Sequence, residues 1–378
     1  MKNFTLTIAI VLIQLLLFAQ CPQGDIYFNT QDQIDNFQIN YPNCSEIEGS
    51  VTISGSDITN LNGLSVLTSI GGDLYIQNNA ALTSLYGLQG LTSIGGGLYI
   101  NGTFGNPVLT SLAGLDNITS IGGDLEISGC DVLTSLTGLD NLTSIMGGLL
   151  IGVPVLTNLA GLDNVAFVGG GLTISSCDIL SSLTGLGNVT SIGGSLSIQN
   201  CDNLTSLTGL ENLTSIYGGL EINSCNALTT LTGLDNIDAG SIYYLHIRYN
   251  QLLSTCEVQS VCNYLVALNG DIFENAPGCN SQEEVEEACE WVSIKENINF
   301  KDILIYPNPS NSTITIELPA QPSKSTTLTI SNINGQQLIT QAITEPQTEI
   351  DFSHLPVGIY VVKVWNDSEV MVRKVIKQ

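Results

Sequence analysis

The chain has 378 residues, of which 43% are hydrophobic and only 12% are charged, a composition typical of folded domains rather than disordered segments. It holds 9 Lys and Arg against 35 Asp and Glu, for a formal net charge of −26, and no Lys or Arg occurs between Asn3 and Ile247. Because nucleic-acid binding draws its affinity from clustered Lys and Arg, this charge excludes nucleic acid and leaves neutral glycans, cations and basic proteins as candidate partners.

The N-terminus has the pattern of a cleaved secretory signal peptide at residues 1–20. Lys2 supplies a positive start, an apolar run extends from Ile8 to Phe18, and Ala19 stands where such peptides end. No later segment reaches the roughly 18 apolar residues of a membrane-spanning helix, so we expect an exported mature protein with no transmembrane helix. A lipid anchor on Cys21 is the less favoured alternative, because Gln20 stands where lipoprotein processing requires a small residue.

Residues 21–50 are expected to cap the structure that follows. Thr30-x-x-Gln33 has the pattern of a capping box, which opens a short helix. Apolar residues follow at helical spacing: Ile34, Phe37 and Tyr41. Cys21 and Cys44 flank this helix, and in an exported protein we expect them to be disulfide-bonded.

A repeat dominates residues 51–250. Its aligned apolar position falls at Ile70, Ile94, Ile121, Ile145, Val168, Ile192, Ile216 and Ile242. The spacings are 24, 27, 24, 23, 24, 24 and 26 residues, which is the period of a solenoid. Within a unit the leucines step by three, as in Leu82, Leu85 and Leu88, which fits a coil that turns a corner every few residues.

Each unit contains a Gly-Gly pair followed by Leu-x-Ile, as in Leu125 and Ile127. We expect the glycines to let the backbone bend tightly and the Leu-x-Ile to form a short strand with alternating inward and outward side chains. Stacked units would form parallel sheets, about 4.8 Å per coil, around a leucine core.

This motif resembles the receptor L-domain type of leucine-rich repeat, in the version found in secreted proteins of the Bacteroidota. The resemblance covers about Gly49 to Asn250 and implies a right-handed solenoid used for adhesion or ligand capture. Three coils depart from the pattern, at Asn101 to Pro107, Gly152 to Pro154 and Val165 to Val168. We expect binding loops at these irregular coils.

Cys130, Cys177, Cys201 and Cys225 share one register, directly after the Leu-x-Ile strand. One thiol per coil without His partners lacks the spacing of a zinc site. Disulfides do not account for all four, because Cys130 is two coils, or about 10 Å, from Cys177. We favour buried, reduced thiols.

Two further columns are candidates for function. Acidic residues share the register after Gly-Leu: Asp116, Asp140, Asp163, Glu211 and Asp235. Stacked carboxylates can recruit Ca²⁺, so Asp116, Asp140, Asp163 and Asp235 are weak calcium candidates, although turn chemistry is favoured. A threonine column holds Thr68, Thr92, Thr119, Thr143, Thr190 and Thr214. A flat hydroxyl array suggests an ice-binding surface, whereas the favoured explanation is that β-branched residues suit strands. No other cofactor is expected.

Residues 251–292 are expected to form a disulfide-bonded helical cap. Ser254-x-x-Glu257 and Ser281-x-x-Glu284 each have the pattern of a helix start, with Val258, Val261, Leu265 and Leu268 on the first helix. Four cysteines bracket the two helices: Cys256, Cys262, Cys279 and Cys289. We expect them to be disulfide-bonded, with a connectivity that the sequence leaves open. A linker at 293–302 follows.

Residues 303–378 change character to short strands separated by Pro, Asn and Gly turns, which predicts a β-sandwich. Asn334-Gly335 is a favoured hairpin turn. The segment resembles the type A C-terminal sorting domain of the type IX secretion system, on Pro307, Asn308, Pro309, Gly335, Gly358, Tyr360, Lys374 and Lys377. The resemblance implies contact with the type IX secretion machinery, outer-membrane translocation and later removal of the domain. An ordinary adhesive sandwich is the alternative.

We therefore predict a mainly β protein, in which a right-handed leucine-rich-repeat solenoid with small helical caps precedes an Ig-like β-sandwich. The predicted function is binding or adhesion by an exported surface or secreted protein, with an unidentified protein or glycan ligand. An ice-binding or purely structural envelope solenoid is the alternative. No enzyme is expected, because the two histidines, His246 and His354, lie in different modules and are interpreted as surface residues.

Overall fold

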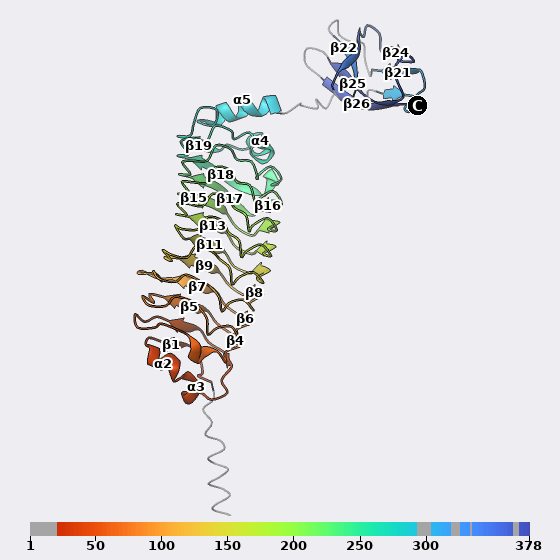
Figure 1. The fold of residues 1–378 in the computed structure, drawn as a ribbon. Helices are drawn as coiled ribbons and strands as arrows, with labels where there is room; N and C mark the ends of the chain where they lie inside the picture. Colours follow the sequence, from red (N-terminus) through yellow and green to blue (C-terminus); the bar gives the residue numbers. More distant parts are fainter. Residues whose placement is uncertain (1–20, 293–303, 319–325, 333–334, 366–369) are drawn as a thin grey trace, which may run out of the picture. The chain divides into compact units, whose positions relative to one another are not determined.

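The computed structural model describes residues 21–292, 304–318, 326–332, 335–365 and 370–378. The predicted signal peptide, the linker and Asn334 lie outside these ranges. The chain divides into two compact units between Ala288 and Cys289 (Figure 1). None of the helices in the described ranges is long and apolar enough to span a membrane.

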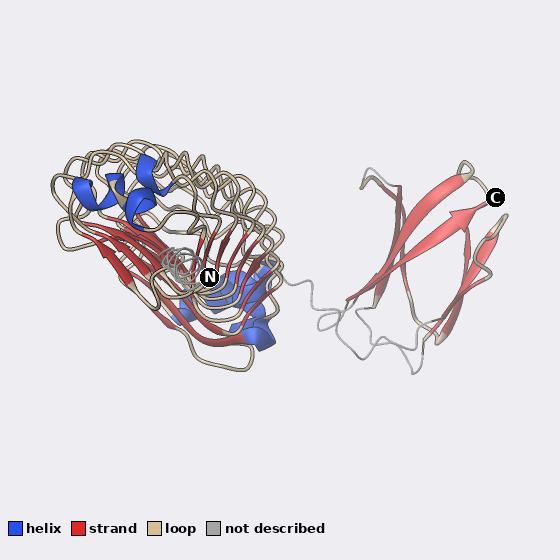
Figure 2. Cartoon of the chain, turned by 90° about the horizontal axis from the view of Figure 1, so that it is seen from below, coloured by secondary structure: helices blue, strands red, loops and turns tan. Residues whose placement is uncertain are grey.

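The first unit is a solenoid whose coils are stacked one behind another (Figure 2). The coils contribute strands to two parallel sheets. The larger sheet has 11 strands, in the order β1 (Ile26–Phe28), β3 (Val51–Ile53), β5 (Leu74–Gln77), β7 (Leu98–Asn101), β9 (Leu125–Ser128), β11 (Leu149–Gly152), β13 (Leu172–Ser175), β15 (Leu196–Gln199), β17 (Gly218–Asn223), β18 (Ile242–Arg248) and β19 (Asp271–Phe273).

The smaller sheet has eight two-residue strands, in the order β16 (Ser215–Ile216), β14 (Ser191–Ile192), β12 (Phe167–Val168), β10 (Ser144–Ile145), β8 (Ser120–Ile121), β6 (Ser93–Ile94), β4 (Ser69–Ile70) and β2 (Glu46–Ile47). Two short 3₁₀ turns, η1 (Asn62–Leu64) and η2 (Ala239–Ser241), complete the coils.

The core confirms the predicted period. Leu82, Leu85, Leu88 and Leu91 all have 0% exposure, so each step of three residues brings a leucine inward at a new corner. In the strands the predicted alternation also holds, as in β5, where Leu74 and Ile76 are buried and the residues between and after them are partly exposed. Full burial of each such side chain contributes about 1.5–3 kcal/mol, so the stacked coils stabilise one another.

The Gly-Gly pairs lie at bends of the backbone, as predicted, and the stacking of the coils adds a second constraint at them. Gly71 and Gly95 are not among the glycines with positive φ; instead, a Cβ on Gly95 would lie 2.3 Å from the carbonyl oxygen of Gly71 in the preceding coil. Close stacking of the coils, in addition to the bend, therefore excludes a side chain. The left-handed conformation occurs at another glycine of the repeat, such as Gly138, with φ 112°.

The N-terminal cap confirms the predicted capping box. The Thr30 hydroxyl accepts a hydrogen bond from the Gln33 backbone N–H, and Gln33 Oε1 accepts one from Thr30 N–H. The helix that it opens, α2 (Gln31–Asp35), is followed at once by a second one, α3 (Phe37–Asn40). Their apolar residues Ile34 and Phe37 are buried, and a disulfide joins Cys21 to Cys44.

At the other end, the predicted helix start at Ser254 is wrong. Helix α4 (Gln259–Leu265) begins after Val258, with no side-chain cap, and Leu268 lies beyond its end. The backbone N–H of Ser254 donates to the Thr229 carbonyl, so this segment still belongs to a coil of the solenoid. Pairing with the preceding coil thus outweighs the local capping pattern.

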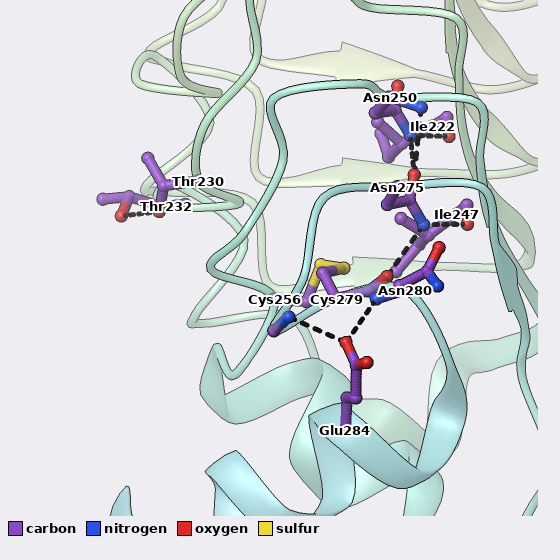
Figure 3. Close-up of a disulfide and its surroundings, with 11 residues drawn as sticks. Ile222, Thr230, Thr232, Ile247, Asn250, Cys256, Asn275, Cys279, Asn280 and Glu284 are labelled. Carbon is purple, nitrogen blue, oxygen red and sulfur yellow. Dashed lines mark hydrogen bonds between the residues drawn. A yellow bond between two sulfur atoms is a disulfide. The ribbon is translucent and has the colours of Figure 1, made fainter.

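Helix α5 (Gln282–Val292) starts as predicted, with Ser281 Oγ accepting from Glu284 N–H at 3.3 Å. The Glu284 carboxylate does not return to Ser281 but accepts from the N–H groups of Gly278 and Asn280 (Figure 3). A disulfide joins Cys256 to Cys279, and Cys262 and Cys289 are also disulfide-bonded. The cap is therefore covalently tied to the last coils.

The four remaining cysteines share a buried column with asparagines. Cys130, Cys177, Cys201 and Cys225 are free and have 0% exposure, as predicted. The same register holds Asn79, Asn106, Val153, Asn250 and Asn275. Each asparagine amide donates to a carbonyl of the preceding coil, as Asn250 Nδ2 does to Ile222 O at 2.9 Å, and Cys225 Sγ makes the corresponding weaker contact with Ile198 O at 3.8 Å. The column therefore ties neighbouring coils together.

We expect the native protein to show almost no alkylation at pH 8, and the denatured, unreduced protein to show four free thiols. Burial raises the pKa of Cys130 to about 12, so the thiol stays protonated and unreactive at this pH. Counting labelled cysteines by intact mass in both states tests this. Rapid labelling of Cys201 in the native protein would contradict an inward-facing column.

The second unit packs two antiparallel sheets around an apolar core, consistent with the predicted β-sandwich. One sheet contains β20 (Leu304–Tyr306), β21 (Thr313–Glu317) and β24 (Gln347–Asp351). The other has the order β23 (Gln337–Ala342), β22 (Thr327–Asn332), β25 (Gly358–Trp365) and β26 (Val370–Lys377).

Candidate functional site

The outward side of the 11-stranded sheet, here called the strand face, carries the most varied side chains of the solenoid. Its central column holds Thr52, Tyr75, Tyr99, Glu126, Leu150, Thr173, Ser197, Glu221, His246 and Asp271. Consecutive members are direct partners in the parallel ladder, so their strands lie about 4.8 Å apart. The column therefore forms a continuous surface along the solenoid.

Two stacked tyrosines mark the N-terminal part of the strand face. The rings of Tyr75 and Tyr99 are 4.8 Å apart with an interplanar angle of 11°. The Tyr75 hydroxyl donates to Asp73 at 2.9 Å, and the Tyr99 hydroxyl donates to Asp124 at 3.3 Å. The hydrogen bond to Asp73 and burial raise the pKa of Tyr75 to about 12, because its phenolate would face a carboxylate.

We expect Asp73→Asn to bring the pKa of Tyr75 down from about 12 toward the ordinary value near 10. The folded-state pKa is raised, so the neutral tyrosine's contribution to stability is complete below pH 10 and is lost as the pH rises toward 12. Titration of ¹³C-labelled tyrosine by NMR, with Tyr75 assigned through Tyr75→Phe, measures the shift. Equal pKa values in the two proteins would contradict the assignment of the cause.

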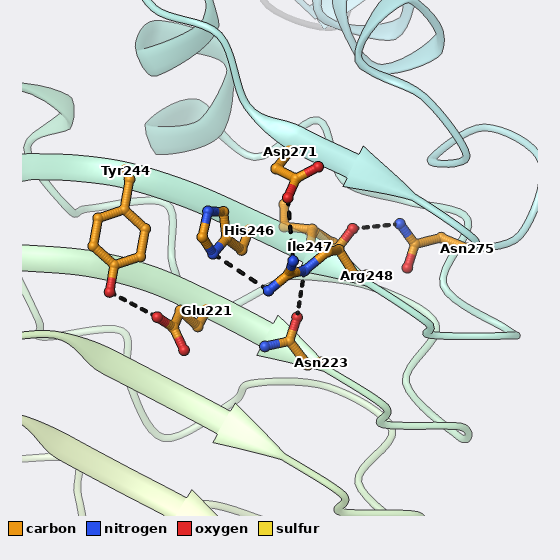
Figure 4. Close-up of polar contacts among 8 residues, drawn as sticks. All are labelled: Glu221, Asn223, Tyr244, His246, Ile247, Arg248, Asp271 and Asn275. Atoms are coloured by element: carbon orange, nitrogen blue, oxygen red, sulfur yellow. Dashed lines mark hydrogen bonds and ion pairs between the residues drawn. The ribbon is translucent and has the colours of Figure 1, made fainter.

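A second cluster lies at the C-terminal end of the strand face (Figure 4). Tyr244 donates to Glu221 at 2.7 Å, and Arg248 forms an ion pair with Asp271 at 3.2 Å. Arg248 also donates to Asn223 at 3.4 Å, and its Nη2 lies 3.4 Å from His246 Nδ1. This is the only ion pair within the ranges that the structure describes.

Sequence reasoning missed this cluster, since His246 was interpreted as an ordinary surface residue. The structure places it half-buried beside Tyr244, with ring centroids 4.8 Å apart. A signal was present, because Arg248 is the first Lys or Arg after Lys2 and stands two residues from one of only two histidines. Residues two apart on a strand share a face. His354, in the second unit, is exposed.

The acidic column serves turns. Asp116, Asp140 and Asp163 each accept a hydrogen bond from the backbone N–H of the glycine two residues earlier, at 2.8–3.0 Å. Asp235 makes the same contact at 3.4 Å. Within the described ranges no group of three His, Cys, Asp or Glu residues is placed to hold a metal ion. The hydrogen bonds of these carboxylates are those of the favoured turn chemistry.

Hydroxyl groups of the threonine column form hydrogen bonds with the backbone of the preceding coil. The hydroxyls of Thr92, Thr143 and Thr214 each donate at 3.0 Å to the carbonyl of the threonine one coil earlier. These hydroxyls therefore support coil stacking, and an ice-binding surface is not favoured. The three irregular coils, where binding loops are predicted, place several of their residues in the interior. Asn106 and Val153 lie buried in the cysteine column and Val165 in the core, whereas Phe104 is exposed.

The predicted sorting residues have structural roles. The Asn308 side chain, between Pro307 and Pro309, pairs with strand β26, donating to Lys374 O at 2.8 Å and accepting from Ile376 N–H at 2.9 Å. Lys377 is 5% exposed, and its ammonium donates to the carbonyls of Phe352, Ser353 and Leu355.

The other sorting residues lie at turns and strand positions. The Tyr360 hydroxyl donates to Pro356 O at 2.6 Å. Gly335 has a positive φ of 78°, Gly358 begins β25, and Lys374 is exposed.

Comparison with known families agrees with both units. The model of the secretion system C-terminal sorting domain matches residues 304–378, and that of the receptor L domain matches residues 43–109 and 164–260. The same coils continue through residues 110–163, between the two matched parts. No curated protein matches the chain. The sorting domain marks proteins exported to the cell surface or extracellular space. The chain is thus a receptor L-domain repeat protein that carries a C-terminal sorting domain of type IX secretion.

Proposed function

We propose that this protein is a non-catalytic binding or adhesion protein that holds a protein or glycan ligand on its strand face after export. The observation that carries the proposal is a contrast between columns of the repeat. At positions where a polar side chain forms hydrogen bonds that hold the coils together, the same residue type recurs from coil to coil. On the strand face it changes at nearly every coil.

The recurring columns show how the scaffold fixes a residue. Asn141, Asn164 and Asn188 are exposed, yet each amide donates to a carbonyl of the preceding coil at 2.6–2.7 Å. A side chain without a hydrogen-bond donor would lose that bond. The strand-face residues Leu150 and Thr173 make no such bond to a neighbouring coil, so the fold does not dictate them. Variation inside an otherwise regular repeat favours selection for a ligand at this face.

A bulky residue in the middle of the strand face tests the proposal. Thr173→Trp should abolish binding to any glycan or surface protein that the full mature chain retains on an array, because the indole would cover the column between Leu150 and Ser197. The matched control is Ser144→Trp on the smaller sheet, where the side chain is also half-buried. Loss of binding in the control alone, or in neither variant, would contradict this placement of the ligand.

A further inference from the structure

The solenoid has almost no cations of its own. Residues 21–288 contain 26 Asp and Glu and one Lys or Arg, Arg248, so their formal charge is 1 − 26 = −25. Such a surface attracts cationic partners over distances comparable to the Debye length. Charge alone does not locate a binding site. The surroundings of Arg248 show which groups hold a cation on this surface.

Arg248 shows what this face does with a guanidinium group. The ion pair with Asp271 holds one side of the group, Asn223 accepts a hydrogen bond from Nε, and the Phe273 ring lies 5.8 Å from the guanidinium carbon. A carboxylate and an aromatic ring on β19 thus hold a cation of the neighbouring strand β18 on the strand face.

The same two kinds of group, an aromatic ring and a carboxylate, occur near the N-terminal end on the neighbouring strands β7 and β9, with no internal cation beside them. Tyr99 is the direct ladder partner of Glu126, so the carboxylate stands one strand, about 4.8 Å, from the strand of the tyrosine. Asp124, two residues before Glu126 and on the same side, accepts from the Tyr99 hydroxyl. Glu126 itself accepts only from Ser128 Oγ, at 3.2 Å. Both carboxylates remain without an ion pair.

We propose that Tyr99, Asp124 and Glu126 bind a lysine or arginine side chain of a basic partner protein. This inference rests on the proposed function and names the chemical class of one ligand group. Glu126 supplies the counter-charge, and the Tyr99 ring supplies the flat surface that an organic cation prefers. A metal ion fits less well, because Asp124 already accepts a second hydrogen bond, from Gly148 N–H at 2.7 Å.

The test measures fluorescence anisotropy of a labelled ten-residue peptide of alternating arginine and glycine against the full mature chain. The same peptide with citrulline in place of arginine keeps the shape and loses the charge. We expect the citrulline peptide to bind at least about tenfold more weakly, and Glu126→Gln and Tyr99→Ala each to weaken the arginine peptide about three- to tenfold. Tyr99→Phe keeps the ring and should bind within about twofold of the unmodified chain.

Asp131→Asn is the matched control, because Asp131 is exposed on the same coil as Glu126 but lies beyond the end of strand β9. It removes the same charge and should change binding less than about twofold. Equal weakening by Asp131→Asn and Glu126→Gln, or equal binding of both peptides, would overturn the site. Preferential binding of a neutral oligosaccharide that Tyr99→Ala abolishes would overturn the cationic class. Either result leaves the Thr173→Trp test of the proposed function untouched.

Discussion

Replacing Asn250 with alanine should lower the free energy of unfolding of the solenoid by about 3 to 5 kcal/mol, because several buried groups lose their partners at once. Its Oδ1 accepts from Cys225 N–H, and its Nδ2 donates to Ile222 O and to Asn275 Oδ1. Asn250 has 0% exposure, so water does not replace these bonds. Each buried group left unsatisfied costs about 1–3 kcal/mol.

Urea unfolding and hydrogen exchange of β17 and β18 measure the effect. Asn236→Ala is the matched control, since its exposed amide makes one bond, to Glu211 O at 2.7 Å. That variant should cost about 0.5–1.5 kcal/mol. Similar losses of unfolding free energy in the two variants would show that burial of the amide does not matter.

Lys377→Met should destabilise the sorting domain by about 3 to 5 kcal/mol, because three carbonyls lose a charged donor. Met keeps most of the aliphatic stem, so the change isolates the ammonium. The three acceptors lie in the turn after β24, and the bond to Phe352 O measures 2.9 Å. Without the ammonium, strand β26 loses one of its ties to the opposite sheet and keeps those through Asn308 and Ser310.

Hydrogen exchange of β21 to β26 in the full chain reports this loss, and the exported fraction of the protein reports its consequence for sorting. Lys374→Met, at an exposed position on the same strand, should change stability by less than about 0.5 kcal/mol. If Lys374→Met reduced protection as much as Lys377→Met, positive charge on the strand rather than the buried contact would be responsible.

The sequence predicted those features that a local period encodes. The leucine steps and the Leu-x-Ile strands were correct because each coil must bury the same positions. The bend at the Gly-Gly pair was predicted, but its second constraint was not, because that constraint is a carbonyl one coil away, about 24 residues earlier, which local bending rules do not contain. The same holds at Ser254, where pairing with Thr229 overrides a capping pattern.

The candidate site was the least predictable part. Tyr99 and Glu126 are 27 residues apart in sequence and become neighbours only through the ladder register, which the insertion at 101–107 shifts. Outward residues carry no period, so nothing in a single coil marks them. Arg248 was visible as an isolated charge, but its partner Asp271 comes from a strand, β19, that the sequence did not indicate.

The hydrogen bonds between coils have a consequence for how such a gene can change. In the threonine column and the exposed asparagine column the side chain donates to the preceding coil, as Thr92 does to Thr68 O and Asn141 to Asp116 O, so interior coils offer their neighbours the same connections there. Duplication or deletion of one unit by unequal recombination would leave these ladders unbroken. It would lengthen or shorten the ligand surface by about 4.8 Å per unit, so the number of repeats would set the length of that surface.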